Sequence, residues 1–179
     1  AGVGSQANSA AGTDCSQSGG TKCDGAGVCV AAPQIASTAP ADAATGVTVW
    51  PKIAITFTQA MNGATLSAQL VPGTPCSGSI QVSTDNFATC IGFATAAPVM
   101  SNGNTTATLT PAPGLSYGST YKIRVTTAAL GVSTLALATE FTTANGFTTL
   151  AAPLTCAGVV ISQLYGGGGL ASATYKNDF

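Results

Sequence analysis

The sequence contains one clear alternating segment, Thr120-Tyr121-Lys122-Ile123-Arg124-Val125. Its second, fourth and sixth residues are apolar, and the residues between them are polar or charged. Because successive side chains of a strand point to opposite faces, this period of two predicts a half-buried strand with both cations in water. Further alternating runs flank it, separated by Gly, Pro and Asn. We therefore predict an all-β protein, built as a small antiparallel β-sandwich.

The other predicted strands are short runs rich in Val, Ile, Thr and aromatic residues, each bounded by turn-forming residues. The full set is 34–38, 47–50, 52–58, 80–83, 89–93, 105–110, 120–128 and 135–143. Residues 61–70 follow a turn and are compatible with one helical turn. Asn102-Gly103 is a strong signal for a tight turn between two strands. About eight short strands with turns at regular intervals predict two packed sheets.

The chain carries unusually little charge. It has five basic and six acidic residues, so that charged residues make up 6% of it, whereas an ordinary soluble domain has about 25%. A net charge of −1 excludes electrostatic binding of nucleic acid, which requires clustered Lys and Arg. Low charge also reduces repulsion between copies and so favours self-association. No apolar run approaches the ~20 residues of a membrane span.

Six cysteines in a chain without histidine favour disulfides over a metal site, since the close paired spacing of zinc-binding cysteines is missing. We expect no metal and no cofactor. Disulfides indicate an oxidising compartment, which is secreted, periplasmic or cell-surface. The small-residue segment that opens at Ala1 is interpreted as a mature terminus left by processing.

The pairing of the cysteines is only partly determined. Cys76 and Cys90 bracket one hairpin-like insertion and are expected to pair, closing a loop of about 15 residues. The others are Cys15, Cys23, Cys29 and Cys156. If all are oxidised, one N-terminal cysteine must bond to Cys156. That bond could form within one chain, or between Cys156 and the cysteine knot of the next copy.

We divide the chain into three parts, 1–32, 33–145 and 146–179. The first begins with a small polar segment, expected to be disordered unless it docks on something. A short disulfide-rich knot follows, and it resembles small cysteine-rich modules of secreted bacterial surface proteins. Asp14 and Asp24 in this knot could bind calcium, but the preference of Asp for turns favours turn positions. The second part is the sandwich, and the third is a linker with a strand-bearing tail.

Four parts of the chain between residues 33 and 143 carry recognisable motifs, namely Ser37–Val47, Ile53–Met61, Leu109–Pro111 with Leu115–Tyr121, and Glu140–Thr143. In this order they resemble the opening, the second strand and the Met after it, the proline turn with the tyrosine-bearing strand, and the closing strand of bacterial Ig-like domains of surface-layer and secreted proteins. The sequence departs from the family at Gln59, where an acid is usual, and in the insertion 71–93. The resemblance implies an Ig-like sandwich that serves as a spacer, adhesive module or assembly unit and has no catalytic residues.

The C-terminal part contains an apolar strand candidate without a sheet of its own. Its residues are Val159, Val160, Ile161, Ser162, Gln163, Leu164 and Tyr165. Together with the glycines that follow and Ala173–Phe179, it resembles the opening of a lamin-tail domain. That domain is itself an Ig-like sandwich, found in secreted bacterial proteins and beside extracellular nucleases. Since an isolated apolar strand is an aggregation hazard, we expect this one to pair with another sheet.

The sequence predicts no enzyme. Ser119 and Lys122 match the Ser-x-x-Lys spacing of some acyl-transfer enzymes, but that chemistry needs both side chains on one face of a helix. In an alternating strand they point to opposite sides. Without histidine there is no Ser-His-Asp or Cys-His arrangement. Tyr117 and Tyr121 are expected as corner and core residues, and Trp50 either caps one end of the sandwich or lies in an interface.

Two functions from different classes remain. In the first, the protein is a non-enzymatic structural subunit at the bacterial cell surface or outside the cell. It stacks head to tail with copies of itself into a fibre or layer, by strand addition and disulfide linkage. In the second, it is an N-terminal spacer or adhesive module of a larger secreted enzyme, such as a nuclease with a lamin-tail domain. A carbohydrate- or host-binding adhesin is a third possibility without a specific residue behind it.

Overall fold

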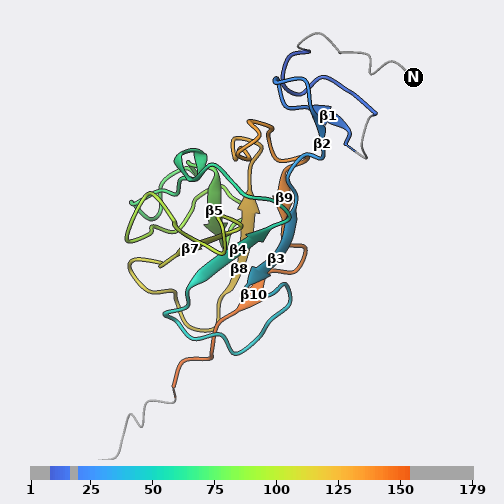
Figure 1. Ribbon diagram of the computed structural model, residues 1–179. Coiled ribbons are helices and arrows are strands. Elements are labelled where there is room, and N and C mark those ends of the chain that lie inside the picture. Colours follow the sequence, from blue (N-terminus) through green and yellow to red (C-terminus); the bar gives the residue numbers. More distant parts are fainter. Residues whose placement is uncertain (1–8, 17–19, 154–179) are drawn as a thin grey trace, which may run out of the picture.

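The computed structural model describes residues 9–16 and 20–153 (Figure 1). Cys156, the strand candidate 159–165 and the lamin-tail-like segment 159–179 lie outside the described residues. The first strands, β1 (Lys22–Cys23) and β2 (Cys29–Val30), form a small antiparallel hairpin. This hairpin projects from one end of a larger β-sandwich, whose last described residues leave at the opposite end (Figure 1).

The first sheet of the sandwich has four antiparallel strands in the order β3-β4-β7-β6. Their bounds are β3 (Ile35–Ala39), β4 (Ile53–Phe57), β7 (Thr106–Leu109) and β6 (Val99–Ser101). The tight turn predicted at Asn102-Gly103 joins β6 to β7, with both residues at positive φ. The pair β3–β4 contains a β-bulge between Ile35 and Ser37. Strands β3 and β6 are the two edges of this sheet.

The second sheet is built around β8 (Thr120–Val125). Strand β5 (Ile80–Ser83) pairs with one side of β8, while β9 (Phe141–Thr142) and β10 (Phe147–Thr148) pair in succession with its other side. The two orders match the two-sheet strand arrangement of an immunoglobulin-type sandwich. The predicted all-β Ig-like fold is therefore confirmed. A short 3-10 helix (Gly63–Thr65) supplies the single helical turn within 61–70.

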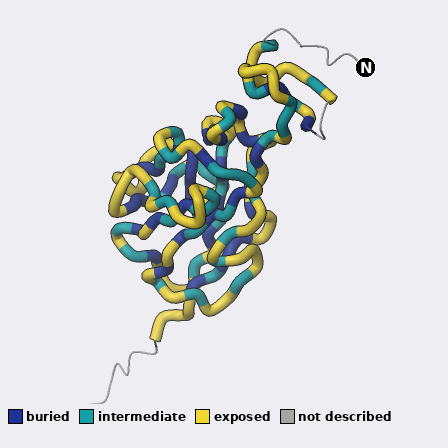
Figure 2. The backbone as a smooth tube through the Cα atoms, viewed as in Figure 1, coloured by how far each residue is buried: buried dark blue, intermediate teal, exposed yellow. Residues whose placement is uncertain are grey.

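The apolar sets of β4 and β8 face each other and form the core (Figure 2). Ile53, Ile55 and Phe57 are buried on one side, and Tyr121, Ile123 and Val125 on the other. Each such burial stabilises the fold by about 1.5–3 kcal/mol. Phe147 joins them from β10, with its ring stacked on that of Tyr121 at a centroid distance of 5.7 Å. The alternation predicted for these two strands is confirmed.

After β3 the chain changes sheets. The backbone N–H of Ala43 donates to the carbonyl oxygen of Gly146 (2.6 Å), and that of Val47 donates to the carbonyl oxygen of Thr148 (3.1 Å). Val47 also forms a parallel bridge with Thr149. Residues 43–47 therefore lie along β10 and close its outer edge. The predicted strand 47–50 is wrong. Its only β-bridge among the described residues is the one at Val47, and the chain leaves β10 at Trp50-Pro51.

Two other predicted strands are also wrong as continuous elements. Within 89–93, only isolated bridges form, at Cys90 and Phe93, because a disulfide folds this segment into a compact loop. Within 135–143, only β9 is a strand. The leucines before it are buried because Leu137 donates its backbone N–H back to the carbonyl oxygen of Ala129 (2.9 Å), which makes a loop that packs onto the core.

Residues 147–149, which we expected within a linker, belong to the sandwich. Phe147 is 1% exposed and lies in the core. The signal was present in the sequence as Asn145-Gly146 before an aromatic residue, because Gly146 supplies the positive φ of a turn. An added Cβ at Gly146 would lie 2.4 Å from the carbonyl oxygen of Tyr121. Only glycine therefore allows β10 to approach β8 at this point.

The N-terminal hairpin is tied to the sandwich by two hydrogen bonds. The amide nitrogen of Gln59 donates to the carbonyl oxygen of Ala31 (2.7 Å), and the hydroxyl of Thr134 donates to the carbonyl oxygen of Asp24 (3.3 Å). A carboxylate at position 59 could not donate, so the departure from the usual acid has a structural use. In the part of the chain that the structure describes, no helix is long and apolar enough to cross a bilayer.

Candidate assembly surfaces

The structure joins Cys15 to Cys29 and Cys76 to Cys90, with Cα atoms 5.9 and 4.9 Å apart respectively. Cys23 is buried and directly opposite Cys29 in the β1–β2 register. It has no disulfide partner among the described residues. Cys156 lies outside them, so its bond to an N-terminal cysteine stays a prediction.

Asp14 and Asp24 both have structural roles in the N-terminal hairpin. Asp14 forms an ion pair with Lys22 across a bridge between the two segments. The carboxylate of Asp24 accepts hydrogen bonds from the backbone N–H groups of Ala26 (2.8 Å) and Val28 (3.0 Å). This is the turn role that the sequence favoured over calcium binding. Within 9–16 and 20–153, no group of three His, Cys, Asp or Glu residues is arranged to hold a metal ion.

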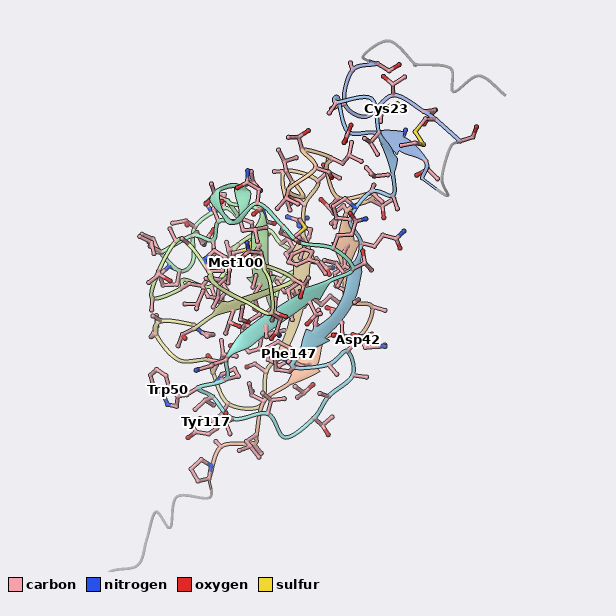
Figure 3. The ribbon with its side chains drawn as sticks, viewed as in Figure 1. Cys23, Asp42, Trp50, Met100, Tyr117 and Phe147 are labelled. Atoms are coloured by element: carbon pink, nitrogen blue, oxygen red, sulfur yellow. A yellow bond between two sulfur atoms is a disulfide. The ribbon has the colours of Figure 1, made fainter. Side chains whose placement is uncertain are left out.

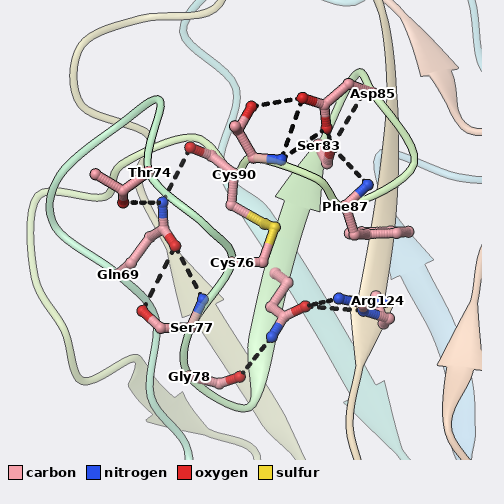
Figure 4. Close-up of a disulfide and its surroundings, with 12 residues drawn as sticks. Gln69, Thr74, Cys76, Ser77, Gly78, Ser83, Asp85, Phe87, Cys90 and Arg124 are labelled. Carbon is pink, nitrogen blue, oxygen red and sulfur yellow. Dashed lines mark hydrogen bonds between the residues drawn. A yellow bond between two sulfur atoms is a disulfide. The ribbon is translucent and has the colours of Figure 1, made fainter.

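The loop closed by the Cys76–Cys90 disulfide is organised around the buried amide of Gln69 (Figure 4). The amide nitrogen donates to the carbonyl oxygens of Val71 (2.9 Å) and Cys90 (3.0 Å), and the amide oxygen accepts from the backbone N–H of Ser77 (3.0 Å). One side chain thereby replaces the ladder hydrogen bonds that this irregular loop lacks.

The loop that follows β5 in this insertion covers part of the outer face of β8. The guanidinium of Arg124 donates from Nε to the amide oxygen of Gln81 (2.8 Å) and stacks over the ring of Phe87, 4.1 Å from its centroid. Both cations of β8, Lys122 and Arg124, are only half-exposed. The prediction that both cations lie in water is therefore wrong for Arg124, which these contacts hold against the sandwich, while Lys122 stays partly exposed. The insertion that covers this face comes from a segment about 40 residues earlier, which alternation within β8 cannot reveal.

A carboxylate closes the tip of the insertion. Asp85 accepts hydrogen bonds from the hydroxyl of Ser83, from the hydroxyl of Thr89 and from the backbone N–H of Thr89. These donors, that of Ser83 first, lower the pKa of Asp85 to about 2. Its oxygens are engaged within the turn, so the shifted pKa reflects a structural role rather than acid–base chemistry.

Two loop segments, one before the insertion at Ser67 and one within it at Ile91, pair with the free edge of the second sheet. The backbone N–H of Ile80 donates to the carbonyl oxygen of Ser67 (2.8 Å), and that of Ile91 donates to the carbonyl oxygen of Val82 (2.9 Å). The edge strand β5 is therefore partly paired by loop segments. Covering an edge in this way prevents another chain from adding a strand there.

The other side of the sandwich is less completely covered. A groove of about 280 Å³ runs between β3 and β9. Its lining residues are Ile35, Ala36, Ser37, Thr38, Ala41, Asp42 and Phe141. The apolar side chains of Ile35 and Phe141 are only partly buried, although both pack against the core.

Asp42 borders this groove but is already engaged. Its carboxylate accepts hydrogen bonds from the backbone N–H groups of Asn145 (2.9 Å) and Gly146 (2.6 Å). Desolvation raises the pKa of Asp42, and these hydrogen bonds outweigh that effect, so the pKa is lowered overall. The interactions fix the turn between β9 and β10 and leave the groove wall mainly apolar.

The end of the sandwich opposite the hairpin carries exposed apolar side chains (Figure 3). Trp50 is 68% exposed and Tyr117 is 48% exposed. The indole of Trp50 covers Gly114, where an added Cβ would lie 2.9 Å from the ring. The backbone N–H of Gly118 donates to the carbonyl oxygen of Leu150 (2.8 Å), which places Leu150, also exposed, beside them. We call Trp50, Tyr117 and Leu150 the C-terminal patch.

The two tyrosines have different roles from one another. Tyr121 is buried, and its hydroxyl oxygen accepts a hydrogen bond from the backbone N–H of Ser116 (2.9 Å). That bond to the chain a few residues upstream is the arrangement of a tyrosine corner. Tyr121 is therefore a core residue, as predicted, and it also takes the corner role, so the expectation of a corner or core role for Tyr117 is wrong. Tyr117 is neither, because it projects from the turn before β8 into solvent.

Comparison with known proteins gives a family. A family model described as "Bacterial Ig-like domain" matches residues 30–149. No curated protein matches the chain. The lamin-tail-like segment lies beyond the matched residues and gains no support from the comparisons.

Similar solved structures include crystal structures of the S-layer protein rSbsC(31-844) and of the N-terminal part of the bacterial S-layer protein SbsC. Each is 18% identical with a TM-score of 0.46 and covers 66% of this chain, which spans 14% and 24% of those chains. The family match extends over well over half of the sequence. The chain therefore belongs to the bacterial Ig-like domain family.

Proposed function

We propose that this protein is a non-enzymatic structural unit, located at the bacterial cell surface or outside the cell, which assembles head to tail with copies of itself. The observation that carries the proposal is that the two ends of one sandwich present different features. The N-terminal hairpin projects from one end, and the C-terminal patch, with Trp50 68% exposed, lies at the other. Unlike ends that meet head to tail generate open chains, or rings where the rotation between copies closes, rather than two-fold dimers.

The chemistry of the described ionisable groups supports a structural role. Asp85 and Asp42 accept hydrogen bonds that fix turns, Asp14 pairs with Lys22, and Arg124 binds Gln81 and Phe87. Each of these side chains is used to hold backbone or a neighbouring side chain. The low charge of the whole chain removes repulsion that would oppose the stacking of copies.

We further propose that the copies are connected through the C-terminal tail. Segment 159–165 supplies a strand to an open edge of the next copy, and Cys156 can add a disulfide to an N-terminal cysteine of that copy. In this arrangement the stack forms a fibre or a layer. Strand addition would provide main-chain hydrogen bonds, and the patch would provide buried apolar area.

The proposal is tested by the mass of the native protein in solution. Sedimentation velocity and negative-stain electron microscopy are expected to show linear oligomers. Replacing Trp50 and Tyr117 together by Ser is expected to shift the distribution toward monomers, because it removes the exposed aromatic surface. The matched control is Val99→Ser, an equally exposed apolar residue on the edge strand β6, at 70% exposure, which is expected to leave the distribution unchanged.

Non-reducing gels test the disulfide part separately. Disulfide-linked ladders that collapse on reduction are expected, and the variant Cys156→Ser is expected to abolish them. A native protein that stays monomeric at all accessible concentrations would contradict the assembly function. Mass spectrometry that finds a long sequence after Phe179 in the native protein would favour the spacer of a larger secreted enzyme instead.

A further inference from the structure

We infer that the groove between β3 and β9 is the acceptor site for segment 159–165 of a second copy. This inference rests on the proposed function, because it names the surface through which the copies join. The donor segment would lie between the two strands, parallel to both, with its side chains over Ile35 and Phe141.

The pairing of the strands leaves this side of the sandwich open. Within the described residues, β3 pairs only with β4, and β9 pairs only with β8. Nearer the end that carries the C-terminal patch, residues 43–47 close the edge of β10 through the parallel bridge between Val47 and Thr149. A strand in the groove would continue that parallel pairing along β9, toward the end that carries the N-terminal hairpin. The edge strand β5, in contrast, is already partly paired by the loop segments at Ser67 and Ile91.

The groove also matches the donor segment chemically. Its wall is formed mainly by apolar and small side chains, and its one ionisable group, Asp42, is satisfied by the turn at Asn145 and Gly146. Segment 159–165 contains no Asp, Glu, Lys or Arg. Its insertion would therefore bury no unpaired charge, while it would remove the partly exposed surfaces of Ile35 and Phe141 from water.

The direction of the chain favours a second copy over the same one. Figure 1 shows that β9 and the start of β3 lie toward the N-terminal hairpin, whereas the chain leaves at the opposite end after β10. Five residues separate Pro153 from Val159, and such a link spans at most about 20 Å. In a head-to-tail stack, the tail of one copy would enter the groove of the next at its Ile35 end. To fill its own groove, the tail would have to reverse and run back along the sandwich.

The test uses one donor variant and one acceptor variant of the full chain. Ile161→Asp places a charge in the donor segment. Ala36→Asp places a charge in the groove, at an exposed residue that lies in the β-bulge and outside the regular ladder with β4. Each variant alone is expected to be monomeric in sedimentation velocity. An equimolar mixture is expected to form dimers and nothing larger, because only one productive joint remains between an intact donor and an intact acceptor.

The control is Val99→Asp on β6, the opposite edge of the same sheet, which is expected to assemble like the wild type. Hydrogen exchange of the wild type provides a second measurement. On assembly, the backbone amides of 35–39 and 141–142 are expected to exchange at least ~10-fold more slowly. Dimers in the mixture also show that both variants are folded, since each must supply one intact surface.

The alternative outcomes separate the inference from the proposed function. Assembly of Ala36→Asp like the wild type, or loss of assembly in Val99→Asp, would overturn the groove as the acceptor and leave the structural function in place. If both charge variants lower the thermal stability of a monomer and leave its mass unchanged, the tail fills its own groove and the second copy is ruled out. A wild type that never assembles would overturn both.

Discussion

Individual side chains take on roles in this protein that depend on their partners rather than on their type. Tyr117 lies in the turn before β8 and Tyr121 lies four residues later, within that strand. Tyr117 is 48% exposed, whereas Tyr121 is buried in the core. The difference arises because the ring of Tyr121 stacks on Phe147 and its hydroxyl reaches the backbone of Ser116. Alternation within 120–125 predicts that Tyr121 is buried, but it does not reveal Phe147, which lies 26 residues later, as the partner of its ring.

We predict that Tyr121→Phe lowers the free energy of unfolding by about 0.5–1.5 kcal/mol, the usual net value of one hydrogen bond. The ring and its stacking remain, so only the bond from the backbone N–H of Ser116 is lost. Urea denaturation followed by circular dichroism measures the change. Tyr117→Phe is the matched control, and an equal loss there would contradict the tyrosine-corner assignment.

We also predict that the contribution of Asp85 depends on pH. Its pKa is lowered from 3.8 to about 2 in the folded protein, so the stabilising effect is present above about pH 4 and is lost as the pH falls toward 2. Asp85→Asn should therefore be less stable than the wild type at pH 6, and the difference should shrink between pH 4 and pH 2. Denaturation at a series of pH values checks this, and a difference that is constant with pH would contradict it.

Strands can be predicted from apolar alternation only where one of their faces is buried in the core and the other is not. The alternation of β4 and β8 is strong because both strands are central in their sheets and contribute three core residues each. The insertion 71–93, which contains β5, shows no such pattern outside that strand. It is held by a buried glutamine, a disulfide and an Asp-centred turn, and it still covers part of the face and pairs with part of the edge of the second sheet.

We predict that replacing Cys76 and Cys90 together by Ala lowers the free energy of unfolding by about 3 kcal/mol, the value for closing a loop of about 15 residues. The loss should also uncover the edge of β5, so the variant is expected to aggregate more readily on mild heating. Chemical denaturation and light scattering measure the two effects. Replacing Cys15 and Cys29 by Ala is the control, and it should leave the unfolding of the sandwich unchanged, since that disulfide lies in the separate hairpin.

The molecule as a whole is a closed sandwich with one covered side, one grooved side and two unlike ends. Its boundaries depend on which segments complete the second sheet. Residues 43–47 and β10 complete it together, so the sandwich extends to about residue 150 rather than 145. The division into a hairpin, a sandwich and a tail stays a proposal, with the tail beginning after β10.

We predict that truncation after Pro153 leaves the sandwich folded, whereas truncation after Asn145 unfolds or strongly destabilises it. The shorter chain lacks Phe147, which is 1% exposed, and lacks the strand against which residues 43–47 pair. Removing a buried aromatic side chain alone typically costs about 3–5 kcal/mol. Thermal unfolding of both truncated chains checks the prediction, and similar melting temperatures for the two would contradict it.

The fold class and the family could be read from the sequence because their signals are local. Alternation within 52–58 and 120–128 gives the two central strands, and the turn at Asn102-Gly103 gives a hairpin. These patterns can be recognised in the sequence because burial of one face imposes a period of two on each strand, independently of its neighbours. The motifs between residues 33 and 143 likewise identify the bacterial Ig-like family before any contact is known.

The candidate surfaces depended on contacts between distant segments. Residues 43–47 lie beside 146–150, the insertion at Phe87 covers Arg124, and Trp50 lies over Gly114. Which edges are closed and which groove stays open follows from these pairings, and no local period encodes them. Local alternation reports whether a face is buried, and folding alone determines what buries it.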